Sequence, residues 1–96
     1  MTDKLTELEE HILVSIKSKD KIGLAELRRI FNQTNERTIR KAIENIRAKG
    51  YPICSDNGYY YPTDTAQVQE CIDGLMKRAF GVLQTANYLQ KGKVNI

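Results

Sequence analysis

An apolar repeat in the last third of the sequence constrains the fold more than any other feature. Its members follow one another at alternating spacings of four and three: Val68, Ile72, Leu75, Ala79, Val82, Ala86 and Leu89. This is the a/d pattern of a coiled coil. It predicts a helix from about Asp64 to Gln90, capped by Thr63, that spans about 40 Å at about 1.5 Å per residue. The preceding residues are too few to cover such a helix, so a second copy of the chain is expected to pair with it.

Residues beside the repeat extend this predicted pairing surface. Met76 and Leu83 widen the apolar seam, while Gly74 and Gly81 are seven residues apart and share a face. Each glycine costs about 1 kcal/mol of helix propensity, so their presence indicates the close approach of another backbone. The alternative is that the seam folds back onto the first helix of its own chain. The predicted dimerisation residues are Val68, Ile72, Leu75, Met76, Ala79, Val82, Leu83, Ala86 and Leu89.

Three shorter helices are predicted upstream of the repeat. Apolar residues at helical spacing place them at about Asp3 to Ser18, Leu24 to Phe31 and Glu36 to Lys49. Asn35 is a favourable N-cap for the third helix, and Gly50 is suited to end it. The buried side of the second helix is expected to hold Leu24, Leu27, Ile30 and Phe31.

Two short extended runs follow the third helix. Asp56-Asn57-Gly58 joins them, which is a strong signal for a β-hairpin, and Pro52 and Pro62 bound them. Side chains alternate across a strand, so Tyr59 and Tyr61 are expected to pack on the core and Tyr60 to be exposed. The elements together predict a mostly helical α+β fold.

Positive charge is concentrated in one segment. The whole chain carries +3, but residues 17–49 contain ten Lys or Arg and four acids, which leaves −3 for the rest. A local basic field attracts polyanions. A solvated lysine-rich face is the alternative interpretation of the same pattern.

The third helix separates its charges from its apolar residues. Ile39, Ile43 and Ile46 recur on one side, so Arg37 and Lys41 point away from the core. A B-DNA major groove admits one helix, and Arg or Lys pairs there with guanine edges or phosphates. The predicted DNA contacts, with two arginines of the second helix, are Arg28, Arg29, Asn35, Glu36, Arg37, Thr38, Arg40, Lys41, Glu44 and Asn45.

Four stretches of the sequence resemble a winged helix-turn-helix: residues 24–31, residues 35–43, residues 46–53 and Gly58-Tyr59-Tyr60. They are similar to the N-terminal DNA-binding domains of biotin-ligase repressors and of WYL-type and DeoR-type bacterial regulators. The resemblance covers about residues 5–62. It implies that the third helix is the recognition helix and the hairpin is the wing. Two features depart from those families, because the wing tip at 55–58 has no Lys or Arg and no effector domain follows.

These observations lead to one expected function. Residues 1–62 form a winged helix-turn-helix, 63–91 a dimerisation helix and 92–96 a flexible tail. The chain is expected to be a homodimeric, sequence-specific binder of palindromic double-stranded DNA, and a repressor-like transcriptional regulator of bacterial or phage origin. The alternatives are a phage or mobile-element accessory for replication or recombination, and an adaptor whose C-terminal helix binds a host protein.

Other classes of function lack the residues that they need. His11 is the one histidine and lies in the first helix, so no Ser/His/Asp or Cys/His catalytic set is expected. Cys54 and Cys71 lack metal-ligand spacing, and the glycines do not form a phosphate-binding loop. No apolar run reaches the ~18 residues of a membrane span, and the N-terminus does not resemble a signal peptide. The expectation is a cytoplasmic protein that is not an enzyme, with reduced thiols and no metal or cofactor.

Overall fold

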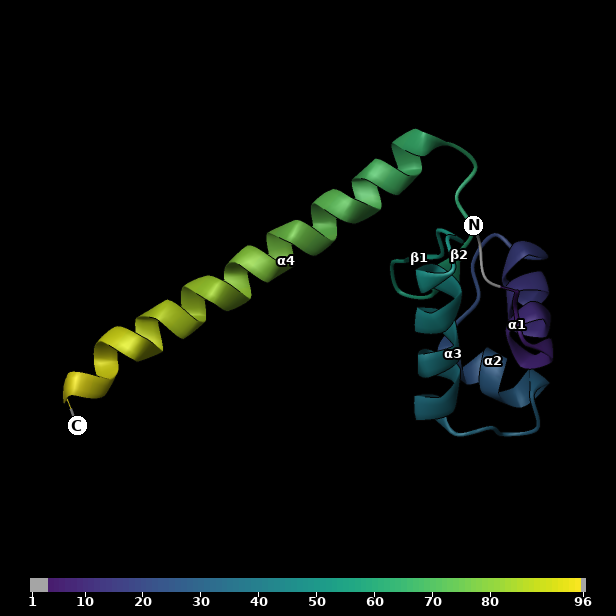
Figure 1. Cartoon of the computed structure of the whole chain (residues 1–96), viewed down its shortest axis with the longest axis horizontal. Helices are drawn as coiled ribbons and strands as arrows, with labels where there is room; N and C mark the ends of the chain where they lie inside the picture. Colours follow the sequence, from purple (N-terminus) through teal and green to yellow (C-terminus); the bar gives the residue numbers. More distant parts are fainter. Residues whose placement is uncertain (1–3, 96) are drawn as a thin grey trace. The chain divides into compact units, whose positions relative to one another are not determined.

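The computed structural model describes residues 4–95 and shows a mostly helical α+β chain (Figure 1). Within these residues it contains four α-helices and one two-stranded antiparallel sheet. The chain divides into an N-terminal unit, Met1–Thr63, and a C-terminal unit, Asp64–Ile96. Each unit is described by itself.

The first helix, α1 (Glu7–Lys17), starts later than the apolar pattern predicts. Thr6 has an extended backbone, and its hydroxyl accepts a hydrogen bond from the Glu9 amide at 3.2 Å. The Glu9 carboxylate accepts in turn from the Thr6 amide at 3.0 Å, which completes a capping box. The expected start at Asp3, which lies outside the described residues, is therefore wrong, because this cap begins the helix at Glu7.

The next two helices are α2 (Leu24–Ile30) and α3 (Glu36–Ala48). The connection between them turns sharply, because Asn32 and Gln33 both have positive φ. The Asn35 side chain accepts from the Arg37 amide at 2.7 Å, which confirms the predicted cap of α3. One expectation for α2 is wrong: Ile30 is 46% exposed, while Leu27 is fully buried.

The core of the N-terminal unit is built from side chains of α1, α2 and α3 and of the segments around them. The three isoleucines predicted for the buried side of α3 are buried together with Ala42, and α3 packs against both α1 and α2. Because the helix is fixed through this side, its opposite side is held outward. The core residues are Ile12, Leu13, Ile16, Ile22, Leu27, Ile39, Ala42, Ile43, Ile46 and Ile53.

The hairpin pairs β1 (Cys54–Ser55) with β2 (Tyr59–Tyr60) in antiparallel register. Gly58 has a φ of +140°, and an added Cβ would lie 2.8 Å from Lys21 Cγ, so the turn requires glycine. Ile22 exchanges two backbone hydrogen bonds with Tyr59, at 2.9 and 2.7 Å, which ties the hairpin to the segment before α2.

The three consecutive tyrosines differ from the prediction at one position. Tyr59 and Tyr61 pack against the core as expected. Tyr60 is half-buried rather than exposed, because the Lys21 ammonium lies over its ring at 6.0 Å from the centroid.

The C-terminal unit consists of α4 (Thr65–Gly92) and a short 3-10 turn, η1 (Lys93–Asn95). The cap of α4 is Asp64, whose carboxylate accepts from the Gln67 amide at 2.9 Å, so the expected cap at Thr63 is one residue off. Gly92 is helical and 93–95 form the 3-10 turn, where the sequence predicted a flexible tail. No helix in residues 4–95 combines the length and apolarity that crossing a membrane requires.

Candidate nucleic-acid interface

The outward side of α3 is polar and open to solvent. Six of the predicted DNA contacts lie on it with exposed side chains, and they follow the N-cap through the first turns of the helix. The exposed residues are Glu36, Arg37, Thr38, Arg40, Lys41 and Glu44.

Two cations on this side are free to meet a ligand. Within residues 4–95, the side chains of Arg37 and Lys41 make no hydrogen bond or ion pair. Arg40 pairs with Glu36 at 3.5 Å one turn away, but both side chains are largely exposed. Such pairs contribute about 0.3–0.5 kcal/mol, so a phosphate or base edge can displace this one.

A shallow groove runs beside these cations, between α3 and the start of α1. Residues from the first three turns of α3 form one wall, and the first turn of α1 with its cap contributes the other. The groove places Arg37 and Lys41 beside a concave surface rather than on a bare helix. Its lining includes Thr6, Leu8, Glu9, Arg37, Thr38, Arg40, Lys41, Ala42, Glu44 and Asn45.

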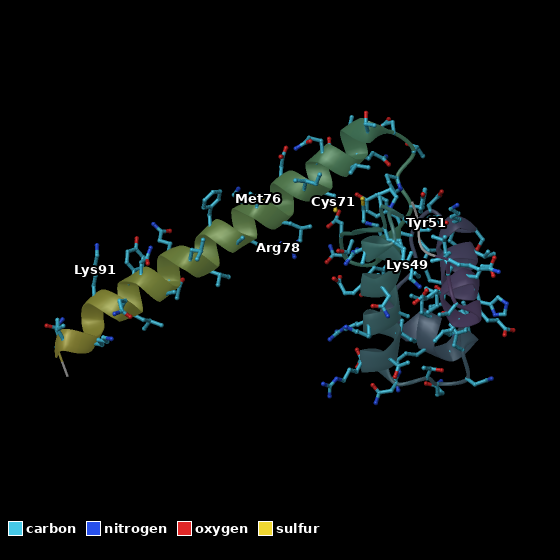
Figure 2. The ribbon with its side chains drawn as sticks, viewed as in Figure 1. Lys49, Tyr51, Cys71, Met76, Arg78 and Lys91 are labelled. Carbon is cyan, nitrogen blue, oxygen red and sulfur yellow. The ribbon has the colours of Figure 1, made fainter. Side chains whose placement is uncertain are left out.

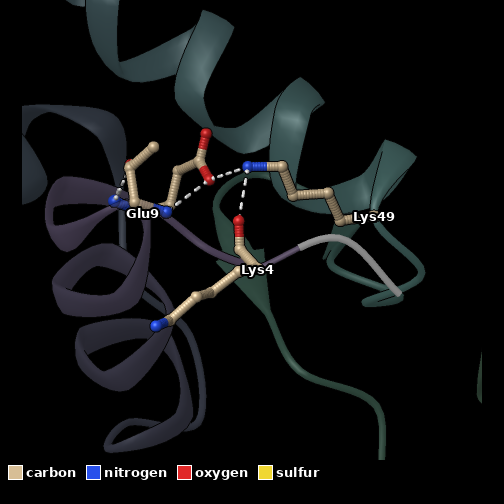
Figure 3. Close-up of polar contacts among 4 residues, drawn as sticks. Lys4, Glu9 and Lys49 are labelled. Carbon is tan, nitrogen blue, oxygen red and sulfur yellow. Dashed lines mark hydrogen bonds and ion pairs between the residues drawn. The ribbon is translucent and has the colours of Figure 1, made fainter. Parts of the chain in front are cut away.

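A nearly buried ion pair joins α1 to the end of α3 (Figure 3). The Lys49 ammonium lies 2.5 Å from the Glu9 carboxylate, and the two side chains are only 18% and 5% exposed. The ammonium also donates to the Lys4 carbonyl at 3.2 Å. The hydrogen bonds from Lys49 and from the Thr6 backbone lower the pKa of Glu9. This pair therefore holds the C-terminal end of α3 against the first turn of α1.

Asn45 belongs to the same cluster. It was predicted to contact DNA, but it is half-buried, and its side chain helps to lower the pKa of Glu9 after the larger effects of Lys49 and the Thr6 backbone. Its position supports the helix rather than extending from it.

Arg47 anchors the hairpin to α3. Its guanidinium donates to the Ile53 carbonyl at 2.8 Å and to the Ser55 hydroxyl at 3.5 Å. It also binds the Glu44 carboxylate at 2.7 Å. Glu44, which was predicted to contact DNA, is therefore paired with a residue of its own helix.

The two arginines of α2 have different environments. Arg28 is half-buried and its Nε donates to the Thr34 carbonyl at 3.2 Å, which braces the turn before α3. Arg29 is exposed. Glu26, between Lys19 and Arg29, has a pKa lowered mainly by its hydrogen bond with Lys19. Of this pair, Arg29 is the more accessible candidate for a phosphate contact.

Sequence reasoning treated the basic segment as uniform, and the structure divides it. Arg28, Arg47 and Lys49 hold the fold, whereas Arg29, Arg37 and Lys41 have accessible charges. The spacing from Thr6 to Glu9 was the available signal for the cap, since Thr-x-x-Glu is the capping-box pattern.

The predicted dimerisation side of α4 is exposed in a single chain except at Val68, which is half-buried. No residue of α4 is buried, and exposure rises from 44% at Ile72 to 70% at Leu89. Two further exposed aromatic residues, Phe80 and Tyr88, lie off the seam and were not singled out from the sequence. Figure 2 labels Met76 on this helix, with Cys71, Arg78 and Lys91.

Comparison with known proteins adds no assignment. The chain matches none of the protein-family models, curated proteins or solved structures with which it was compared. Across residues 4–95, no three His, Cys, Asp or Glu side chains gather in a metal-binding arrangement. The function of this chain is therefore inferred from the geometry of α3 and α4.

Proposed function

We propose that this protein binds double-stranded DNA in a sequence-specific manner as a homodimer, and that it acts as a repressor-like transcriptional regulator. One observation carries the proposal. The apolar side of α3 is buried, so the helix is rigidly held, while Arg37 and Lys41 project from the opposite side without partners.

The N-terminal unit supplies the parts of a winged helix-turn-helix. In this interpretation α2, the turn at 31–35 and α3 are the helix-turn-helix, and the hairpin is the wing. The N-terminal residues of a recognition helix reach the base edges. Glu36, Arg37 and Thr38 hold those positions, Lys41 follows one turn later, and Arg29 on α2 is placed for a phosphate.

The wing contributes little positive charge in this proposal. Its tip, 55–58, carries no cation. The neighbouring Lys21 lies 3.8 Å from Asp56 at the tip, which offsets its charge. We therefore assign the affinity for DNA mainly to the exposed cations of α3.

Pairing through α4 completes the proposal. A two-fold symmetric dimer presents two copies of α3, so it favours a palindromic site. A DNA-binding accessory for replication or recombination would use the same surface, and footprinting on neighbouring genomic DNA separates it from a transcriptional regulator.

The test selects bound sequences from random DNA and measures affinity for the selected site. Arg37→Ala and Lys41→Ala are each expected to weaken binding tenfold or more, since a good base or phosphate contact contributes about 1–3 kcal/mol. Each variant removes two cations per dimer, so the slope of log affinity against log salt should fall by about 2. Lys4→Ala, which removes an equal charge from an exposed position outside the groove and α4, is the matched control.

The competing function is an adaptor that binds another protein through α4. The exposed rings of Phe80 and Tyr88 favour it, because pairing through the a/d seam leaves both of them uncovered. Normal DNA affinity in both Arg37→Ala and Lys41→Ala would refute the DNA-binding assignment and leave the adaptor as the better account.

A further inference from the structure

The two halves of α4 carry opposite charge. Residues 64–76 contain three acids and no Lys or Arg, while residues 77–95 contain four Lys or Arg and no acid. Two such helices attract each other when the first half of one lies on the second half of the other. The charged residues are Asp64, Glu70 and Asp73 in the first half, and Lys77, Arg78, Lys91 and Lys93 in the second.

The two halves of the seam also differ in side-chain size. Ile72 and Leu75 are large, whereas Ala79 and Ala86 are small. Because of these small residues, the second half has a shallow apolar hollow on its surface. The hollow is lined by Arg78, Gly81, Val82, Thr85, Ala86 and Leu89.

We propose that α4 pairs antiparallel with α4 of a second copy, the large first half of each seam filling the small second half of the other. The inference rests on the homodimer in the proposed function and adds its orientation and register. Antiparallel seams place an a residue beside a d residue of the partner. The proposed register pairs six of the seven seam residues: it joins Leu75 to the partner's Ala79, Ile72 to the partner's Val82, and Val68 to the partner's Ala86.

Each layer of this register combines complementary sizes. A large residue meets an alanine in two of the three layers, and two β-branched residues meet in the third, so the helices keep a nearly constant separation. Interiors are packed at a density that leaves few voids. The charges agree with an antiparallel pair, because the acidic first half of each helix lies along the basic second half of the other, and the helix dipoles also oppose each other.

A parallel pair agrees poorly with both the side-chain sizes and the charges of α4. It stacks Ala79 on the partner's Ala79 and Ala86 on the partner's Ala86, next to layers of paired Ile72 and paired Leu75. The thickness of the seam would then change abruptly. It also lays the acidic half of each helix along the acidic half of the other and the basic half along the basic half, which is less favourable than the antiparallel arrangement.

The register also sets the distance between the starts of the two helices. Thr65 of one copy comes level with Leu89 of the other, so the two copies of Thr65 are about 36 Å apart at about 1.5 Å per residue. One helical turn of B-DNA separates half-sites by about 34–36 Å. The starts of the paired helices are thus separated by a distance similar to that between successive half-sites.

Native Cys71 provides a direct test. In the antiparallel pair, the residues just before each a position flank the same side of the seam, which brings Cys71 beside Thr85 of the partner. Thr85→Cys should therefore form a disulfide-linked dimer under oxidised glutathione, with Cys71 joined to position 85. Gln84→Cys, on the outer side of α4, is the matched control and should not link. Cys54 is buried and should not compete.

A second variant tests the same antiparallel orientation on the other edge of the seam. Gln69→Cys with Leu83→Cys in a Cys71→Ser background should link position 69 of one copy to position 83 of the other. These two positions come together in the antiparallel register, whereas a parallel pair holds them about 21 Å apart along the axis at about 1.5 Å per residue. A dimer by sedimentation that links in neither variant overturns the antiparallel inference and leaves the homodimer standing. A monomer at all concentrations overturns the pairing itself, while DNA binding by the N-terminal unit is judged separately from the Arg37 and Lys41 variants.

Discussion

The two units of this protein use their apolar residues in opposite ways. The N-terminal unit buries its isoleucines and leucines against one another, with Ile12, Ile16 and Ile39 all at 0% exposure. In α4 the large apolar side chains from Ile72 onward are at least 44% exposed, and no residue is buried. The N-terminal unit buries its apolar side chains within one chain, whereas the apolar side of α4 becomes buried only when α4 associates with another surface.

This contrast has an energetic consequence. An isolated helix gains most of its stability from packing of an apolar side rather than from propensity. The two glycines inside α4 lower its propensity further, by about 1 kcal/mol each. Folding of α4 is therefore expected to be coupled to pairing and to depend on protein concentration, whereas unfolding of the N-terminal unit should not.

The largest expected effect breaks α4 and spares the N-terminal unit. Leu75→Asp with Val82→Asp places two carboxylates in every seam and should give a monomer by sedimentation equilibrium, with loss of helical circular dichroism. Affinity for a palindromic site should fall by 100-fold or more, since the two half-sites no longer act together. Gln84→Asp together with Asn87→Asp is the matched control, because it adds the same number of acids and the same charge on the outer side. An unchanged mass in the seam variant would refute the pairing surface.

The next effect acts on the N-terminal unit alone. Glu9→Gln removes the charge that Lys49 requires in a nearly buried pair, and should lower the free energy of unfolding of this unit by about 2 kcal/mol. Urea denaturation of the seam variant above, followed by tyrosine fluorescence, isolates this unit. Glu10→Gln, exposed on the same helix, should change it by less than about 0.5 kcal/mol.

The same pair has a pH signature with a defined sign. The pKa of Glu9 is lowered in the folded state, so its contribution is complete above the unfolded value of about 4.3 and is lost as pH falls through the folded value. The difference in stability between wild type and Glu9→Gln should be constant above about pH 5.5 and shrink on acidification below about pH 4.5. A difference that stays constant down to pH 3 would contradict the role assigned to the pair.

Most of the fold could be predicted from patterns that are local in the sequence, whereas contacts between residues far apart in the sequence could not. The ends of α3, its buried residues, the hairpin at 54–60 and the extent of α4 follow from spacing and from capping residues close in sequence. The partners of Lys49 are 40 and 45 residues away. No helical or strand periodicity links such positions, so a sequence pattern shows Lys49 only as one more positive charge.

The candidate site was predictable to the same extent. The exposed side of α3 follows from its isoleucines, which is why Arg37 and Lys41 were found. The structural uses of Arg28, Arg47 and Asn45 were not, because each reaches a group that only the folded chain brings near. A long side chain in a basic segment is ambiguous until the positions of neighbouring carbonyls and carboxylates are known.

The smallest effect concerns Gly74 and Gly81, whose faces are open in one chain. Nothing lies within 4 Å of a Cβ built at either position. The sequence suggested that another backbone approaches them, but the proposed register places both of them about 130° from the centre of the seam at about 100° per residue. If the register is right, Gly74→Ala and Gly81→Ala should each stabilise the dimer by about 1 kcal/mol, from propensity alone.

The two glycine substitutions test whether any surface outside the seam contacts α4. Thermal unfolding at several protein concentrations gives the answer, with Gly58→Ala as a contrasting control, since its positive φ and the nearby Lys21 side chain predict a loss of stability. Weaker dimers in both α4 variants would mean that a backbone does pack on the glycine side. The pairing surface would then have to include that side, and the seam would no longer account for it alone.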